Sequence, residues 1–170
     1  MTKVVEGDIE ITAPNGVSIR KHDDVTTHGL SHCMKAVDFI IEQNDRIYFI
    51  ELKDPDNPNA QAAALAGFKA ELASGQLDSK LATKFRDSYL YELASNRLPK
   101  PVYYIVLIGL HSLTAVELVT RTDALKKQLP IHGPFNKPWP RPLAAGCVVV
   151  NLDNWAKVMP NFPIRRLSAV

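Results

Sequence analysis

The stretch that decides the fold is residues 35–53, which read KAVDFIIEQNDRIYFIELK. Two apolar, β-branched and aromatic runs flank the polar pair Asn44-Asp45, a pattern that predicts two antiparallel strands joined by a tight turn. With that pair at the centre of the turn, Asp38 faces Glu51 across the strands. Directly opposed side chains have Cβ atoms roughly 4.5–5.5 Å apart, where like charges destabilise a sheet. The hairpin therefore predicts a positive charge beside these two carboxylates.

The second strand of this hairpin carries apolar residues on both of its faces over residues 47–52, which is typical of a central, buried strand. Its end is charged. Lys53 points to the same face as Glu51, because side chains alternate along a strand. Desolvating a charge is costly unless the charge is paired or bound to a metal. We therefore expect Lys53, together with a divalent cation, to neutralise the pair of acids.

Length and composition predict one globular domain over residues 1–170. The chain is 46% hydrophobic and 22% charged, and both values are ordinary. It contains no apolar run of transmembrane length, and its first residues lack the apolar core of a signal peptide. We therefore expect a cytoplasmic protein with no membrane contact. Cys33 and Cys147 are too few for a disulfide framework, and we expect both to be reduced and buried.

Charge is distributed unevenly along the chain. Residues 1–79 hold 7 Lys and Arg against 13 Asp and Glu, whereas residues 80–170 hold 13 against 5. An acidic half that contains the opposed carboxylates, next to a basic half, suits a metal site beside a surface that binds a polyanion. The alternative is a chance division of solvated charges.

The N-terminal region, residues 1–34, is interpreted as a hairpin followed by a loop. Alternating residues 9–12 and 17–20 flank Asn15-Gly16, a strong hairpin signal. The loop contains three histidines and a cysteine, namely His22, His28, His32 and Cys33. Their spacing matches no common structural zinc pattern, so we expect polar, partly solvated histidines.

Two helices are predicted after the central hairpin. The first covers residues 60–74, with Asn57 as N-cap and Gly75 as its stop. The second covers residues 78–95, and its apolar positions recur at helical spacing: Leu77, Leu81, Phe85 or Tyr89, and Leu93. Lys80 and Lys84 lie on one side of this helix, where they either grip phosphates or form a solvated face.

The remaining segments complete an α/β pattern. We expect an interior strand over residues 102–110, a helix over 114–129, a strand over 147–152 and a short helical stretch over 155–159. Residues 130–146 form a proline-rich loop around Trp139, suited to a surface arm or a partner contact. The predicted fold is a central mixed β-sheet flanked by helices, with residues 35–110 as its core.

Asp38, Glu51 and Lys53 are the groups that metal-assisted phosphodiester hydrolysis uses. Mg²⁺, or Mn²⁺ in its place, prefers oxygen ligands, and the two carboxylates with the main-chain carbonyl of Leu52 form one face of such a shell. The metal lowers the pKa of a bound water and stabilises developing charge. Lys53 then orients or helps to deprotonate that water.

The spacing of Asp38, twelve intervening residues and then Glu51-Leu52-Lys53 resembles the PD-(D/E)XK nuclease superfamily. The resemblance implies a restriction-endonuclease-like fold and a divalent-metal-dependent nuclease, with Asp38 and Glu51 as metal ligands and Lys53 as the catalytic lysine. It further implies an endonuclease acting on nucleic acid, most simply DNA, in restriction, repair or recombination. Many members carry a Gln early in the following helix, and Gln61 lies in that region.

Two departures from the superfamily pattern stand out. Val37 replaces the Pro of the motif. Members also often place a further acid on a helix before the first motif strand, whereas residues 1–34 are predicted to form a hairpin and a loop. The sequence does not choose between four candidates for this acid: Glu6, Glu10, Asp23 and Asp24.

Five residues are the expected nucleic-acid contacts: Lys35, Gln61, Lys80, Lys84 and Arg86. Nucleases that cut both strands are frequently symmetric dimers, so a homodimer is expected. The alternative is a catalytically inactive, nuclease-like protein that binds nucleic acid or serves in an assembly. A third hypothesis is a protein-interaction domain that uses the proline-rich loop.

Overall fold

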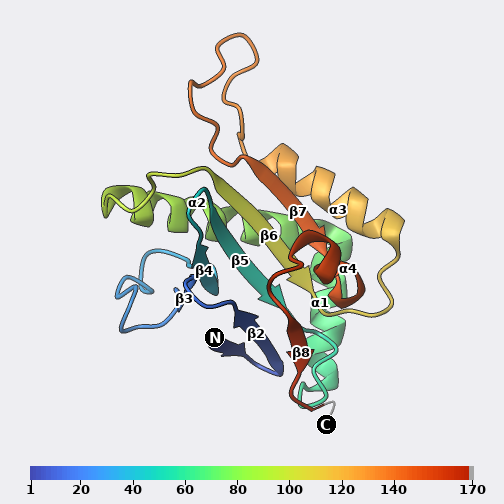
Figure 1. The fold of residues 1–170 in the computed structure, drawn as a ribbon. Coiled ribbons are helices and arrows are strands. Elements are labelled where there is room, and N and C mark those ends of the chain that lie inside the picture. The colour runs from blue at the N-terminus through green and yellow to red at the C-terminus, as the bar shows by residue number, and fades with distance from the viewer. Residues whose placement is uncertain (169–170) are drawn as a thin grey trace.

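The central hairpin forms as the sequence predicts. In the computed structural model, which describes residues 1–168, it consists of β4 (Phe39–Glu42) and β5 (Ile47–Lys53) (Figure 1). Phe39 pairs with Ile50 and Glu42 with Ile47, the register that a turn at Asn44-Asp45 requires. Asp38 lies one residue before β4, so the ladder ends beside it.

Five strands make the main sheet, in the order β3-β4-β5-β6-β7. The new members are β3 (Ser18–Lys21), β6 (Val102–Ile108) and β7 (Gly146–Val150). The pairs β3–β4 and β4–β5 are antiparallel, whereas β5–β6 and β6–β7 are parallel, so the sheet is mixed as predicted. β5 lies at its centre, and its residues 49–52 are buried.

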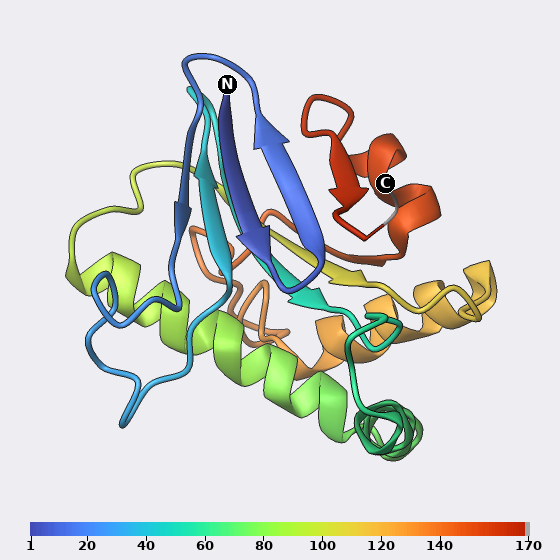
Figure 2. The ribbon, with the colours of Figure 1, turned by 90° about the horizontal axis from the view of Figure 1, so that it is seen from below.

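Three longer helices accompany one face of this sheet: α1 (Ala62–Ser74), α2 (Gln76–Ala94) and α3 (Ala115–Gln128) (Figure 2). α2 and α3 bury Leu81, Phe85 and Leu125 in the same cluster as Phe49 of the sheet. Figure 2 shows α2 running along the side of the main sheet away from β1 and β2. This face is the one to which odd-numbered residues of β5 point.

The other face is covered by a second sheet, of order β1-β2-β8, and by α4 (Leu152–Val158). Its strands are β1 (Thr2–Glu6), β2 (Ile9–Ala13) and β8 (Ile164–Arg166). Ile9 and Ile11 are fully buried, in one cluster with Phe39. The α/β architecture therefore has three layers.

The predicted hairpin around Asn15-Gly16 is wrong. β2 pairs with β1 and β8, while β3 pairs with β4 in the other sheet. The turn that closes a hairpin here is at Gly7, which has φ +56°. Apolar and polar residues alternate along both flanking strands, but this alternation does not specify which strand pairs with which. The burial of Ile9 and Ile11 in the tertiary structure decides the pairing.

Helix boundaries are largely confirmed. Gly75, with φ +78°, ends α1 as predicted. The start is two residues later than predicted, because the Asn57 side chain accepts a hydrogen bond from the main-chain N–H of Asn59 and forms a turn there instead of capping the helix. In α2, Leu93 is 51% exposed, so the apolar stripe ends before it.

The C-terminal half follows the predicted order of elements as far as α4, which begins three residues earlier than predicted, but the sequence analysis does not predict β8. α3 begins with a capping box between Thr114 and Glu117. Residues 130–145, here called the arm, contain no helix or strand and protrude beyond the main sheet (Figure 1). β7 ends at Val150 because Asn151 caps α4. Cys147 is buried as expected, but Cys33 is exposed, contrary to expectation, and both are free thiols. Within residues 1–168, no helix has the length and apolarity needed to cross a bilayer.

The interface of α2 with the sheet yields a test of this packing. Phe85 is fully buried, with its ring centroid 5.6 Å from that of Phe49 and 4.8 Å from that of Tyr104. We expect Phe85→Ala to lower the free energy of unfolding, measured by urea denaturation, by about 3–5 kcal/mol. Leu90→Ala on the same helix, where the side chain is 58% exposed, should change it by only about 0.5 kcal/mol. Equal effects of the two substitutions would contradict this packing.

Candidate functional site

Asp38, Glu51 and Lys53 meet at the end of β5, as predicted. Glu51 is fully buried and points to the α2 side of the sheet, and Lys53 Nζ lies 2.5 Å from its Oε1 atom. Asp38 is also buried, and its Oδ2 atom accepts a hydrogen bond of 2.6 Å from the main-chain N–H of Leu52. This bond fixes one carboxylate against the strand that carries the other.

A fourth residue, Lys84 of α2, completes the cluster. Its Nζ atom lies 2.7 Å from Glu51 Oε1 and 3.2 Å from Asp38 Oδ1, so it bridges the two acids. The hydroxyl of Tyr104 donates to the main-chain oxygen of Leu81 at 3.0 Å and anchors the preceding turn of α2 to β6. The positive charge that the hairpin predicts is therefore supplied by a helix as well as by Lys53.

Lys84 is predicted from the sequence as a phosphate contact, without a connection to the acids. The spacing of residues along the helix does indicate that Lys84 faces the sheet. Lys84 is three residues after Leu81 and four before Ser88, both of which are buried. It therefore lies on the stripe of α2 that faces the sheet.

Burial and neighbouring charge shift the ionisation of this cluster. Burial and the charge of Asp38 raise the pKa of Glu51 to about 7, while Lys53 and Lys84 act in the opposite direction. Burial acts to lower the pKa of Lys84, but the carboxylates of Glu51 and Asp38 outweigh it and raise that pKa. The Glu51 Oε2 atom is buried and has no hydrogen-bond partner within residues 1–168.

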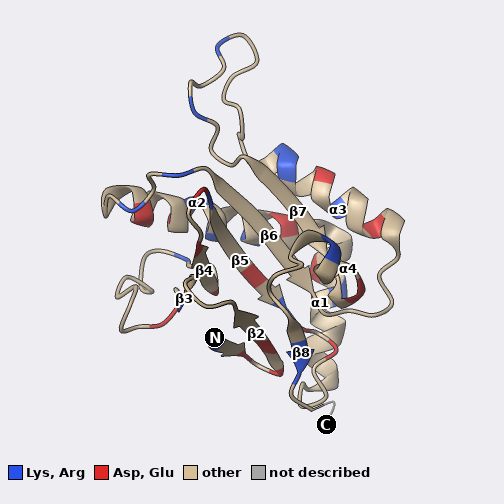
Figure 3. Cartoon of the chain, viewed as in Figure 1, with Lys and Arg blue, Asp and Glu red and all other residues tan. Residues whose placement is uncertain are grey.

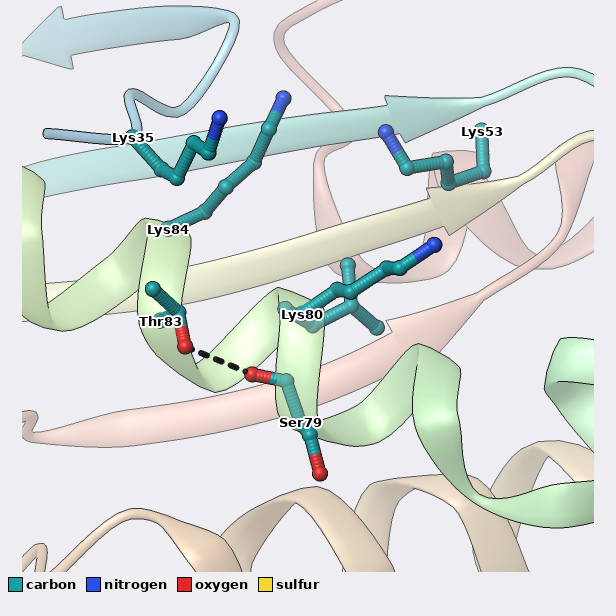
Figure 4. A pocket seen from close by; sticks show the side chains of 7 residues that line it. Lys35, Lys53, Ser79, Lys80, Thr83 and Lys84 are labelled. Atoms are coloured by element: carbon teal, nitrogen blue, oxygen red, sulfur yellow. Dashed lines mark hydrogen bonds between the residues drawn. The ribbon is translucent and has the colours of Figure 1, made fainter. Parts of the chain in front are cut away.

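A cleft of about 480 Å³ opens beside the cluster. Figure 4 shows four lysine side chains around it, from β5, from α2 and from the segment before β4. Its lining comprises Lys35, Lys53, Ser79, Lys80, Leu81, Thr83 and Lys84. Of the five predicted nucleic-acid contacts, three therefore line one cleft.

The other two predicted contacts, Gln61 and Arg86, do not line this cleft. Gln61 precedes α1 and lines a separate cavity with Asp56 and His111, because α1 begins well beyond the end of β5. Arg86 is exposed, and its guanidinium lies 3.5 Å from Thr83 Oγ1. Two residues after Lys84 on a helix, it is turned away from the acids.

Most basic residues of the second half of the sequence do not line the cleft. Lys and Arg residues are spread over the arm, α3 and β8 among other elements (Figure 3). The lysines of the cleft come from both halves of the chain: Lys35 and Lys53 from the acidic half, Lys80 and Lys84 from the basic half. The fold, and not the charge of either half, creates the local positive surface.

Among the four candidates for the further acid of the superfamily pattern, Asp23 is the one whose pKa is shifted by the charge of Asp38. Partial burial and then the charge of Asp38 raise the pKa of Asp23 to about 6. Glu10 instead pairs with Lys3 and Arg165 on the small sheet.

The two remaining acids of that set have other partners. Glu6 pairs with Lys21 at 2.8 Å. Asp24 accepts a hydrogen bond from the main-chain N–H of Thr26 at 2.8 Å.

The oxygen atoms of Asp38 and Glu51 provide some of the ligands that a hard cation such as Mg²⁺ requires. Asp38 and Glu51 provide carboxylate oxygen atoms on one side of the cleft, and the unpartnered Glu51 Oε2 atom is free to act as a ligand. Leu52 reaches the site through its main-chain N–H. No group of three or more His, Cys, Asp or Glu side chains in the described part of the chain is arranged to hold a metal ion.

The histidines of the N-terminal loop differ from expectation, because two of them are buried. Burial lowers the pKa of His22 to about 4, although Glu92 acts in the opposite direction. His28 stacks on Tyr91 with ring centroids 4.4 Å apart. These rings anchor the loop to α2, a long-range contact that the polar composition of the loop does not reveal.

Comparisons with known proteins identify no relative of this chain. No protein-family model, curated protein or solved structure matches this chain.

The raised pKa of Glu51 predicts a pH-dependent stability. Between its ordinary pKa of 4.5 and about 7, the folded state binds more protons than the unfolded state, so the contribution of Glu51 to stability falls as the pH rises. We expect the free energy of unfolding of the wild type, relative to Glu51→Gln, to fall by a few kcal/mol over this range, at about 1.4 kcal/mol per pKa unit. Urea denaturation in EDTA measures it, and a constant difference would contradict a raised pKa.

Proposed function

We propose that this chain is a divalent-metal-dependent nuclease with a restriction-endonuclease-like fold, similar to PD-(D/E)XK enzymes. The observation that carries the proposal is the convergence of Asp38, Glu51 and Lys53 at the end of β5, beside a cleft lined by four lysines. The substrate that fits such a cleft is a polyanion, and the proposed one is nucleic acid, most simply DNA.

The architecture supports the finer assignment of the fold. β4 and β5 are antiparallel neighbours that carry the motif, and β6 then joins β5 in parallel after two helices. This order agrees with the predicted succession of the central hairpin, two helices and an interior strand. The antiparallel pairing brings Asp38 to the end of β5, where Glu51 and Lys53 lie.

Asp38 and Glu51 are the residues that would hold the metal. When bound there, Mg²⁺ or Mn²⁺ would supply charge stabilisation at the phosphate and a water of lowered pKa. Lys53 is 30% exposed in its side chain, so it can meet both Glu51 and a group in the cleft. Its role in the proposal is to orient the attacking water and to stabilise negative charge on the phosphate.

Lys35 and Lys80 have a different role in the proposal. Both line the cleft without contacting Asp38 or Glu51 through their side chains in the described structure, and Lys80 Nζ lies 2.5 Å from Glu71 Oε1 on α1. An exposed ion pair of this kind contributes little to stability, so Lys80 can exchange Glu71 for a phosphate at small cost. Two such lysines position the substrate backbone without reading its sequence.

A second candidate function is nucleic-acid binding without cleavage. The position of Lys84 favours it, because one ammonium already bridges both acids. Such a protein binds DNA through the same cleft, with a steep salt dependence, and needs no metal.

Cleavage of plasmid and of single-stranded DNA separates these functions. With Mn²⁺ or Mg²⁺, we expect cleavage by the wild type and at least about a 100-fold lower rate for Asp38→Asn, Glu51→Gln or Lys53→Met, since each removes a ligand or the group that acts on the water. Lys157→Met on α4, across the sheet, is the matched control and should cleave as the wild type does.

Retained cleavage in any of the three site variants, with folding verified by circular dichroism, would contradict the assignment. Binding that weakens steeply with salt, combined with no cleavage in either metal, would instead establish the second function.

A further inference from the structure

Lys84 differs from the other lysines of the cleft in what it contacts. Its ammonium is within 3.2 Å of Asp38 Oδ1 and within 2.7 Å of Glu51 Oε1, whereas Lys53 contacts Glu51. The space between the two carboxylates is where a cation bound by both would lie. Since an ammonium and a divalent cation repel each other, they cannot share that space.

The charge balance of the cluster points the same way. Two buried carboxylates, those of Asp38 and Glu51, face two ammonium groups, those of Lys53 and Lys84. Removing either positive charge leaves a buried acid uncompensated, which is costly. Adding a divalent cation with both lysines in place would create a surplus of two positive charges. Release of one ammonium when a metal enters would relieve the repulsion between these cations.

Lys84 is the ammonium that can leave. Its side chain is 22% exposed and lines the cleft (Figure 4). Rotation about its four-carbon stem would therefore move Nζ from the acids into the cleft. The helix itself need not move, because Tyr104 holds the preceding turn through the main-chain oxygen of Leu81. In the cleft, the ammonium would lie near the side chains of Lys35 and Lys80, which line the same cleft.

We propose that Lys84 is a resident counter-ion that competes with a divalent cation for Asp38 and Glu51, and that metal entry moves its ammonium into the cleft to bind a substrate phosphate. The inference rests on the proposed function of this site. It makes Lys84 a positioning residue that keeps the acids ordered without metal. It also couples the two ligands, because metal binding frees a cation for the phosphate and phosphate binding favours the metal.

Calorimetric titration of the full chain with MnCl₂ alone, at about pH 8, tests the competition. We expect Lys84→Met to bind Mn²⁺ at least about tenfold more tightly than the wild type, because a like charge is removed from the site. Lys157→Met, the same change on α4 across the sheet, should alter the affinity by less than about threefold, since a distant charge is screened.

Two further variants keep the test decisive if Lys84→Met fails to fold. Lys84→Gln retains hydrogen-bond donors for both carboxylates without the charge, and should also bind Mn²⁺ more tightly. Lys84→Arg retains the charge and should bind no more tightly than the wild type. An affinity in Lys84→Met and Lys84→Gln that equals the wild-type value would overturn the competition.

The same preparations distinguish this inference from the nuclease proposal. Cleavage by the wild type with no gain in Mn²⁺ affinity in the neutral variants contradicts the competition and leaves the nuclease function standing. Tighter Mn²⁺ binding in the neutral variants with no cleavage by the wild type supports the competition and contradicts the nuclease function. Absence of Mn²⁺ binding in every variant contradicts both.

Discussion

The structure depends on the compensation of two buried carboxylates. Asp38 and Glu51 lie where water cannot solvate them, and burying an uncompensated charge costs several kcal/mol in practice. Lys53 compensates from the same strand and Lys84 from α2. This requirement fixes the rotation of α2 about its axis, because a helix that buries Leu81 and Phe85 and also presents Lys84 to the sheet has one orientation that satisfies all three.

The rest of the fold serves to hold that geometry. β5 is covered on one face by the helices and on the other by the small sheet and α4, so its residues 49–52 are buried. The antiparallel β4 places Asp38 beside Leu52, and the parallel β6 carries Tyr104, which secures α2. Apolar packing thus determines where the charges lie.

The two proposed functions, cleavage and binding without cleavage, differ in the role of the Lys84 ammonium. If Lys84 yields its place, Asp38 and Glu51 become ligands and the cleft gains a cation for the substrate. If it stays, the acids are satisfied within the chain and the cleft serves for binding alone. The two cases differ in free energy. For Lys84 to be displaced, the free energy of binding of a divalent cation to both carboxylates must exceed the free energy lost when the ammonium leaves them.

The sequence by itself determined the β4–β5 register, the stop of α1 at Gly75 and the meeting of Glu51 with Lys53, because turn chemistry, helix capping and strand alternation act between near neighbours. It did not determine that β2 belongs to a second sheet, that His22 is buried or that Lys84 bridges the acids. Each of those depends on segments distant along the chain, and partner choice among alternating strands is decided by which surfaces bury together. The sequence located the acids, and only tertiary packing decided which cation lies between them.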